Sequence, residues 1–120
     1  MLYSDVTSKI LEASFEVSKE LGAGFLESVY EKALIVALSQ KGLNSISQMR
    51  LQVKFRQVIV GDFYADLFVG EKVLIELKAV SRLMPEHKAQ VINYLKATGI
   101  EVGLLINFGN PKIEYSRLHN

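Results

Sequence analysis

Apolar residues recur at helical spacing in the first part of the chain. From Asp5 to Leu21 they are three or four positions apart, which predicts one buried helical stripe. The residues of this stripe are Val6, Ile10, Ala13, Val17 and Leu21. Ser4 or Asp5 would cap the start of this helix, and Gly22 would end it.

A second helix is expected from about Phe25 or Glu27 to Lys41, with Gly42 as its C-terminal stop. Four residues at helical spacing should face the core. They are Tyr30, Leu34, Ala37 and Leu38. The chain therefore opens with two consecutive amphipathic helices.

The middle of the chain has the pattern of β-strands. The segments "RLQVKFRQVIVGD" and "FYADLFVGEKVLIELKAV" alternate or run apolar, and they are rich in β-branched and aromatic residues. Two pairs, Gly61-Asp62 and Gly70-Glu71, interrupt these segments and are typical of hairpin turns. We therefore predict a three-stranded antiparallel meander.

Helical spacing returns after Pro85 in "EHKAQVINYLKATG", which should end at Gly99. The next segment, "VGLLINF", is apolar on both faces, as expected of a central strand, and "KIEYSRL" would be an edge strand. Because a helix joins the third strand to the fourth, these two strands should be parallel, through a right-handed crossover. The element order predicts an α/β fold with a mixed central β-sheet flanked by α-helices.

The composition is that of an ordinary globular protein, and 120 residues suit a single domain, which we expect to span residues 1–120. The chain has no cysteine, which excludes disulfides and cysteine-based zinc sites and favours a reducing compartment. It shows neither the order of a signal peptide nor the roughly 20 apolar residues of a membrane span. We therefore expect a cytoplasmic protein that does not bind membranes. The net charge of +1 argues against coating nucleic acid by bulk charge, but it is compatible with a local basic cleft.

Three charged residues interrupt the apolar runs of the last predicted hairpin, "ADLFVGEKVLIELKAV". Glu76 and Lys78 must share a face, because side chains alternate along a strand. Asp66 joins them only in one register. A two-residue turn would place it on the opposite face from Glu76, whereas a three-residue loop pairs Val69 with Val73 and places Asp66 across from Glu76. We predict the three-residue loop.

Two carboxylates across a strand pair repel, and each raises the other's pKa unless a cation lies between them. Mg²⁺ or Mn²⁺ suits such a site, because these ions need only one or two carboxylates together with waters and substrate phosphate. Lys78 could orient or deprotonate the attacking water, or stabilise charge on the phosphate. The alternative is that all three charges lie on a solvated face, and their spacing alone does not exclude it.

Asp66 followed by Glu76-Leu77-Lys78 on the next strand, in this order of elements, resembles the PD-(D/E)XK nuclease superfamily. The segment "GFLESVY" resembles the signature of its GxxExxY family, and "ELKAV", "NYLKATG" and "GLLINFG" extend the likeness over nearly the whole chain. The resemblance implies a restriction-endonuclease-like core. Ala65 stands where the strict motif has proline, a departure that is common in this superfamily.

The same resemblance implies roles for individual residues. Asp66 and Glu76 would bind the metal together with the backbone carbonyl of Leu77. Lys78 would assist catalysis, and Glu27 would be an auxiliary acid near the metal. The alternative for Glu27 is a favourable charge in the first turn of a helix.

The segment "QVINY" resembles the Gln-x-x-x-Tyr element of the superfamily's exonuclease and repair-nuclease branch. Gln90 and Tyr94 are four residues apart and so share one helix face. The resemblance implies that they contact the phosphate or nucleotide beside the metal, while a core aromatic is the alternative for Tyr94. His87 is expected at the surface near the helix start rather than as a ligand. Tyr30 also has a core position as its alternative.

The resulting hypothesis is a metal-dependent nuclease that uses Mg²⁺ or Mn²⁺ and acts on nucleic acid, DNA being expected rather than RNA. The alternative is a nuclease-like module, weak or inactive in catalysis, that binds nucleic acid or protein. A homodimer would enlarge the nucleic-acid surface in either case.

Overall fold

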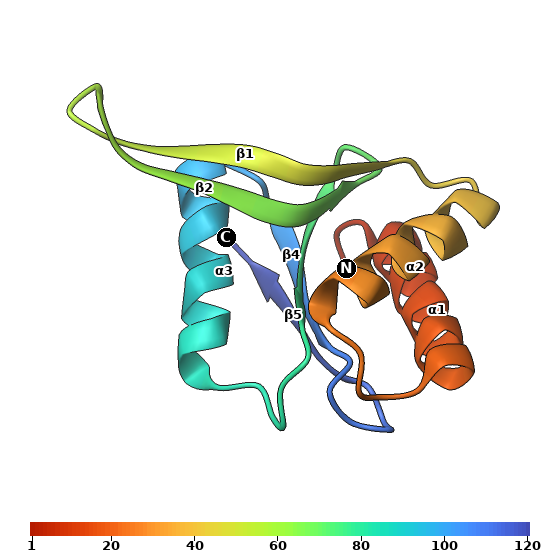
Figure 1. Cartoon of the computed structure of the whole chain (residues 1–120). Coiled ribbons are helices and arrows are strands. Elements are labelled where there is room, and N and C mark those ends of the chain that lie inside the picture. The colour runs from red at the N-terminus through yellow and green to blue at the C-terminus, as the bar shows by residue number, and fades with distance from the viewer.

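The computed structural model describes residues 1–120 and contains three helices and a five-stranded sheet (Figure 1). The helices are α1 (Ser4–Leu21), α2 (Glu27–Gln40) and α3 (Pro85–Thr98). The strands are β1 (Ser45–Phe55), β2 (Val58–Val69), β3 (Val73–Lys78), β4 (Val102–Asn107) and β5 (Glu114–His119). They lie side by side in chain order, and only β3 and β4 are parallel. The predicted α/β fold with a mixed, helix-flanked sheet is confirmed.

The two faces of the sheet are covered by different helices. Consecutive residues of β3, Leu74 and Ile75, point to opposite faces, as strand geometry requires. Leu74 packs with Val91 and Leu95 of α3, whereas Ile75 belongs to the larger core formed with α1 and α2. Every residue of β4 is buried, which confirms its prediction as a central strand. No helix combines the length and apolar composition needed to cross a membrane.

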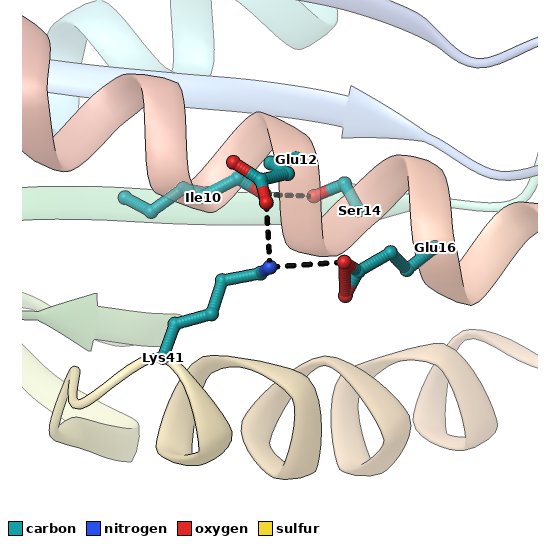
Figure 2. A network of polar contacts seen from close by, with 5 residues as sticks. All are labelled: Ile10, Glu12, Ser14, Glu16 and Lys41. Atoms are coloured by element: carbon teal, nitrogen blue, oxygen red, sulfur yellow. Dashed lines mark hydrogen bonds and ion pairs between the residues drawn. The ribbon is translucent and has the colours of Figure 1, made fainter.

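The first two helices form an antiparallel pair, and two surface ion pairs of Lys41 join them. Lys41 donates to the carboxylates of Glu12 and Glu16 at 2.9 Å each (Figure 2). The helix ends agree with the prediction at Gly22 and Gly42, both of which have positive φ. Two details were wrong: no side chain caps α1, whose N-cap residue is Tyr3, and Leu21 is 38% exposed.

The first hairpin turns earlier than its glycine suggested. The two residues between β1 and β2, Arg56 and Gln57, have φ values of 50° and 71°, and this is the turn. Gly61 and Asp62 instead lie inside β2. The Phe63 ring packs against Gly61, where a Cβ would lie 2.7 Å from Cε2 of the ring. The predicted turn at Gly61-Asp62 is therefore wrong, although the three-stranded meander is confirmed.

The second hairpin has the predicted three-residue loop. Val69 pairs with Val73, and the amide of Lys72 donates to the carbonyl of Val69 at 3.1 Å. Gly70 and Glu71 both adopt left-handed backbone conformations within this loop. The register that brings Asp66 opposite Glu76 is thus the one the protein adopts.

Tyr30 fastens the loop between α1 and α2. Its side chain is fully buried and its ring stacks on Phe108 with 4.8 Å between centroids. The hydroxyl donates to the carbonyl of Gly22 at 2.6 Å and accepts from the amide of Phe25 at 3.2 Å. The tyrosine of "GFLESVY" therefore has a structural role, as the alternative interpretation held.

Replacing Tyr30 by phenylalanine should lower the free energy of unfolding by about 1–2 kcal/mol, because two loop hydrogen bonds are lost while the stacked ring remains. Urea unfolding measures this. The exposed Tyr115, replaced in the same way, should change it by less than about 0.5 kcal/mol. Equal effects of Tyr30→Phe and Tyr115→Phe would contradict the structural role.

Candidate active site

Asp66 and Glu76 lie where β2 and β3 separate. The pairing of these strands runs from Val69↔Val73 to Leu67↔Ile75 and then stops. At the next position, side-chain carboxylates replace backbone carbonyls as hydrogen-bond acceptors. The amide of Asp66 donates to Oε1 of Glu76 at 3.1 Å, and the amide of Leu77 donates to Oδ2 of Asp66 at 2.7 Å. The structure therefore brings the two predicted carboxylates together, at a fork in the sheet.

The irregular backbone of β1 and β2 explains this fork. Ala65 packs in the cluster on the α3 side, yet Leu67, two residues along, packs in the cluster with α1 and α2. Residues two apart in a regular strand would face the same side. Gln48, which lies opposite Asp66 between two regular pairs, has a φ of 52°. The strand thus rotates at Asp66, and this rotation turns its carboxylate toward β3.

Glu31 belongs to the surroundings of the site, although the sequence did not single it out. The side-chain amide of Gln48 donates to Oε1 of Glu31 at 2.8 Å and to Oδ1 of Asp66 at 3.3 Å. The hydroxyl of Ser47 donates to the other oxygen of Glu31 at 2.9 Å. An acidic residue of α2 is therefore connected to Asp66 through one glutamine.

Glu27 is one helical turn before Glu31, at the exposed start of α2. It takes part in no side-chain hydrogen bond or ion pair, and it does not form a three-carboxylate metal cluster with Asp66 and Glu76. Its assignment as the auxiliary acid stays a prediction. The spacing of four residues from Glu27 on one helix face was the available signal for Glu31.

Two residues of the site have raised pKa values. Burial, followed by the neighbouring charge of Asp66, raises the pKa of Glu76 to about 8, while the Asp66 amide and the charge of Lys78 oppose the shift. Burial also raises the pKa of Tyr94, and the charges of Glu76 and Asp66 add to the effect. Tyr94 on α3 is thus close enough to both carboxylates for their charges to affect its pKa. A positive ion between them would relieve the repulsion.

The donor atoms fit a small, hard dication. Oε2 of Glu76 accepts no hydrogen bond, and Oδ1 of Asp66 has only the long contact from Gln48. No group of three or more His, Asp or Glu side chains converges anywhere in the chain. Mg²⁺ and Mn²⁺ tolerate such a sparse set, since one or two carboxylates and several waters suffice. Asp66, Glu76 and the carbonyl of Leu77 could hold such an ion.

Lys78 shares the face of Glu76 and is half-buried at the end of β3. It forms no ion pair, and its charge lowers the pKa of Glu76. Its partner in the parallel pairing is the fully buried Asn107. The ammonium group is therefore available near the carboxylates.

Asn107 fixes the chain as it leaves β3. Its side-chain oxygen accepts from the amides of Val80 and Gly109 at 3.0 Å each, and its side-chain nitrogen donates to the carbonyl of Val80 at 2.9 Å and to Glu114 at 3.2 Å. Gly109 must lack a side chain, because a Cβ would overlap the backbone of Val80. This clamp holds the segment that connects Lys78 to α3.

The α3 residues Gln90 and Tyr94 line one groove of about 680 Å³ between α3 and the β1–β2 hairpin. Tyr94 is 8% exposed and its ring contacts Phe63 of the hairpin at 5.6 Å between centroids. His87 caps the start of α3, because its Nδ1 accepts a hydrogen bond from the amide of Met84 at 3.0 Å. Its predicted place near the helix start agrees with the structure.

Solved structures with a similar fold include the following two proteins. The crystal structure of the protein SSO0001 superposes with a TM-score of 0.61 at 17% sequence identity, covering 98% of this chain and 59% of that one. This chain therefore spans little more than half the length of SSO0001. An alkaline exonuclease from Laribacter hongkongensis superposes with a TM-score of 0.52 at 11% identity, covering 95% and 82%. At these identities the likeness establishes the fold alone.

No curated protein matches the chain in sequence. The sequence model of one family does match, over residues 4–118, and its description is the PD-(D/E)XK nuclease superfamily. The matched range covers the three helices, β1 to β4 and all but the last residue of β5, and it contains the two carboxylates at the fork of β2 and β3 and Lys78. The chain belongs to the PD-(D/E)XK nuclease superfamily.

Proposed function

We propose that this protein is a nuclease that depends on Mg²⁺ or Mn²⁺ and hydrolyses phosphodiester bonds of nucleic acid, with DNA as the expected substrate. The observation that carries the proposal is the meeting of Asp66 and Glu76 at the fork of the sheet, with Lys78 on the same face. The superfamily match and the fold shared with an alkaline exonuclease support the reaction class.

Asp66, Glu76 and the carbonyl of Leu77 would hold the ion. A divalent cation bound there would act as a Lewis acid on the phosphate and would lower the pKa of a water molecule. Lys78 would orient the attacking water or stabilise the charge that develops on the phosphate oxygens. Its free ammonium group suits either role, since it is not neutralised by an ion pair.

Residues of α3 would bind the substrate. The Tyr94 hydroxyl is protonated at neutral pH, and burial raises its pKa further, so it would donate a hydrogen bond to a phosphate oxygen beside the carboxylates. Gln90, one turn earlier on the same helix face, would contact the adjacent nucleotide. Glu27 would be an auxiliary acid near the metal, and Glu31, the α2 residue linked to Asp66 through Gln48, is the other acidic residue of α2 beside the site.

Within the superfamily we place the chain with the GxxExxY family, on the segment "GFLESVY". A homodimer would extend the surface available to nucleic acid.

One observation favours a second candidate function, a binding module without catalysis. Both carboxylates already accept backbone hydrogen bonds, from Asp66 itself and from Leu77, so they stabilise the fork without any ion. Such a module would bind nucleic acid or protein and cut nothing.

Cleavage of labelled single- and double-stranded DNA and RNA distinguishes the two. Wild-type protein should cut in Mg²⁺ or Mn²⁺ and not in EDTA, and Glu76→Gln and Lys78→Met should each reduce the rate at least about 100-fold. Glu71→Gln and Lys72→Met are matched controls, because these exposed residues lie in the adjoining loop, and they should retain the rate. No cleavage of any substrate would favour the binding module. Equal rates in all variants would indicate a contaminating nuclease.

A further inference from the structure

The groove between α3 and the β1–β2 hairpin extends beyond Gln90 and Tyr94, and the rest of its lining has no part in the proposed phosphodiester chemistry. Its volume of about 680 Å³ lies in the range of small-ligand pockets, roughly 300–1,000 Å³. Val53 and Phe63 line it from the hairpin, and Gln90, Asn93 and Tyr94 line it from α3. Figure 1 shows the hairpin reaching across α3, which is how the two walls come to face each other.

Phe63 is held as an exposed aromatic platform. It is 42% exposed, although a ring of this size normally gains from burial. One side rests on the backbone of Gly61, where a Cβ would lie 2.7 Å from Cε2 and 3.3 Å from Cζ. Tyr94 contacts the ring from α3, with 41° between the ring planes. The Phe63 ring therefore lies in the space left by the missing side chain of Gly61.

The chemistry of the lining selects an uncharged, planar ligand with polar edges. The two amide side chains, Gln90 and Asn93, can each donate and accept hydrogen bonds. The charged residues of the lining are Glu86 and Lys96, whose formal charges cancel. A phosphate would gain little here, whereas a nucleobase offers a face for Phe63 and edges for the amides.

Tyr94 links the groove to the candidate active site. It lines the groove and packs in the same buried cluster as Ala65, the residue before Asp66. The charges of the two carboxylates also affect its pKa. A nucleotide whose phosphate lies at Asp66 and Glu76 would therefore have its own or its neighbour's base beside the groove.

We propose that the groove binds an unpaired nucleobase of single-stranded nucleic acid, stacked on Phe63, next to the phosphate at the Asp66–Glu76 site. This inference rests on the proposed function and names its substrate class. A base inside a duplex is already stacked and paired, so its face reaches the ring only if the strand is single or its end is frayed.

Binding of short oligonucleotides that contain 2-aminopurine, a base whose fluorescence changes on stacking, tests this. The assay uses a Glu76→Gln background in EDTA, so that nothing is cut. Adding Phe63→Ala should weaken binding about tenfold, within the roughly 5- to 150-fold expected for one base–aromatic stack, and should remove the fluorescence change. Phe63→Trp should keep both, and Gly61→Ala should reduce both by displacing the ring.

Two matched controls isolate the base. Phe55 is 59% exposed at the tip of the same hairpin and lies outside the groove, so Phe55→Ala should leave binding unchanged. An oligonucleotide of abasic sites keeps the phosphates, so it should bind the Phe63→Ala and parent proteins equally. Thermal unfolding of each variant checks that the fold is retained.

The outcomes separate this inference from the proposed function. Stacking that depends on Phe63, without cleavage by the protein with Glu76 intact, would support the base site and overturn the nuclease. Cleavage of single strands by Phe63→Ala at the wild-type rate would support the nuclease and overturn the base site. Sedimentation showing a dimer that Phe63→Ala dissociates would mean that a second copy covers the groove, and would overturn the base site.

Discussion

The metal-free protein should lose stability as the pH rises from about 5 to about 9, because Glu76 keeps its proton in the folded state up to a pKa of about 8. In the unfolded chain the same group releases its proton near pH 4.3. The folded state therefore binds more protons between these values, and the free energy of unfolding falls with pH across this window. The loss has an upper bound on the order of 4 kcal/mol.

Thermal unfolding in EDTA at several pH values measures this loss, and Glu76→Gln isolates it. The variant has no proton to release, so it should be more stable than the wild type above pH 8 and should follow a flatter pH profile. Glu71→Gln, the exposed control, should follow the wild type. Added Mg²⁺ should stabilise only proteins that retain Glu76, and more strongly at pH 8.5 than at pH 5. Parallel profiles of wild type and Glu76→Gln would contradict the buried, protonated carboxylate.

Replacing Asn107 by alanine should lower the free energy of unfolding by about 3 kcal/mol. The residue is fully buried and satisfies both the amide and the carbonyl of Val80 and the amide of Gly109. Each partner left unpaired away from water costs about 1–3 kcal/mol, less where water can enter. Because Asn107 pairs with Lys78, cleavage should slow as well.

Asn110→Ala is the matched control for this substitution. Asn110 follows in the same turn and makes one side-chain hydrogen bond, from its Nδ2 to the carbonyl of Ser81 at 2.7 Å. Chemical denaturation should show a change of less than about 1 kcal/mol for this variant. If both asparagine variants unfold at the same denaturant concentration, Asn107 is not the clamp of the β3 exit.

Local pattern was sufficient to predict most of the fold. Helical spacing gave the buried faces of α1 and α2, and the apolar run of β4 gave its central place. The length of the hairpin loop could be deduced because Asp66 and Glu76 face each other across the strands in only one register. Val69 does pair with Val73, as that register requires.

The errors came from contacts between distant parts of the chain. Gly61 was predicted as a turn because glycine favours turns, but it lies within β2, where the Phe63 ring occupies the space beside it. No local signal marks Arg56 and Gln57 as the turn, since neither residue favours a positive φ. Tertiary contacts here override the intrinsic preference of a single residue.

The surroundings of the site were the least predictable part. Gln48 contacts Asp66 where the strand rotates, and Glu31 is linked to Asp66 only through Gln48; the alternation of side chains along a strand predicts neither contact. Asn107 did carry a signal, as the one polar residue in the apolar segment "VGLLINF". Motif spacing thus identifies the residues of the fork, while their supporting hydrogen bonds depend on the folded backbone.

Anomalous scattering from crystals soaked in Mn²⁺ tests most directly whether Asp66 and Glu76 hold a cation. We predict a peak within roughly 2–2.3 Å of an oxygen of each carboxylate, and no peak in crystals of Glu76→Gln. A peak bound by other residues, or an Asp66–Glu76 pair without an ion at saturating Mn²⁺, would contradict the account.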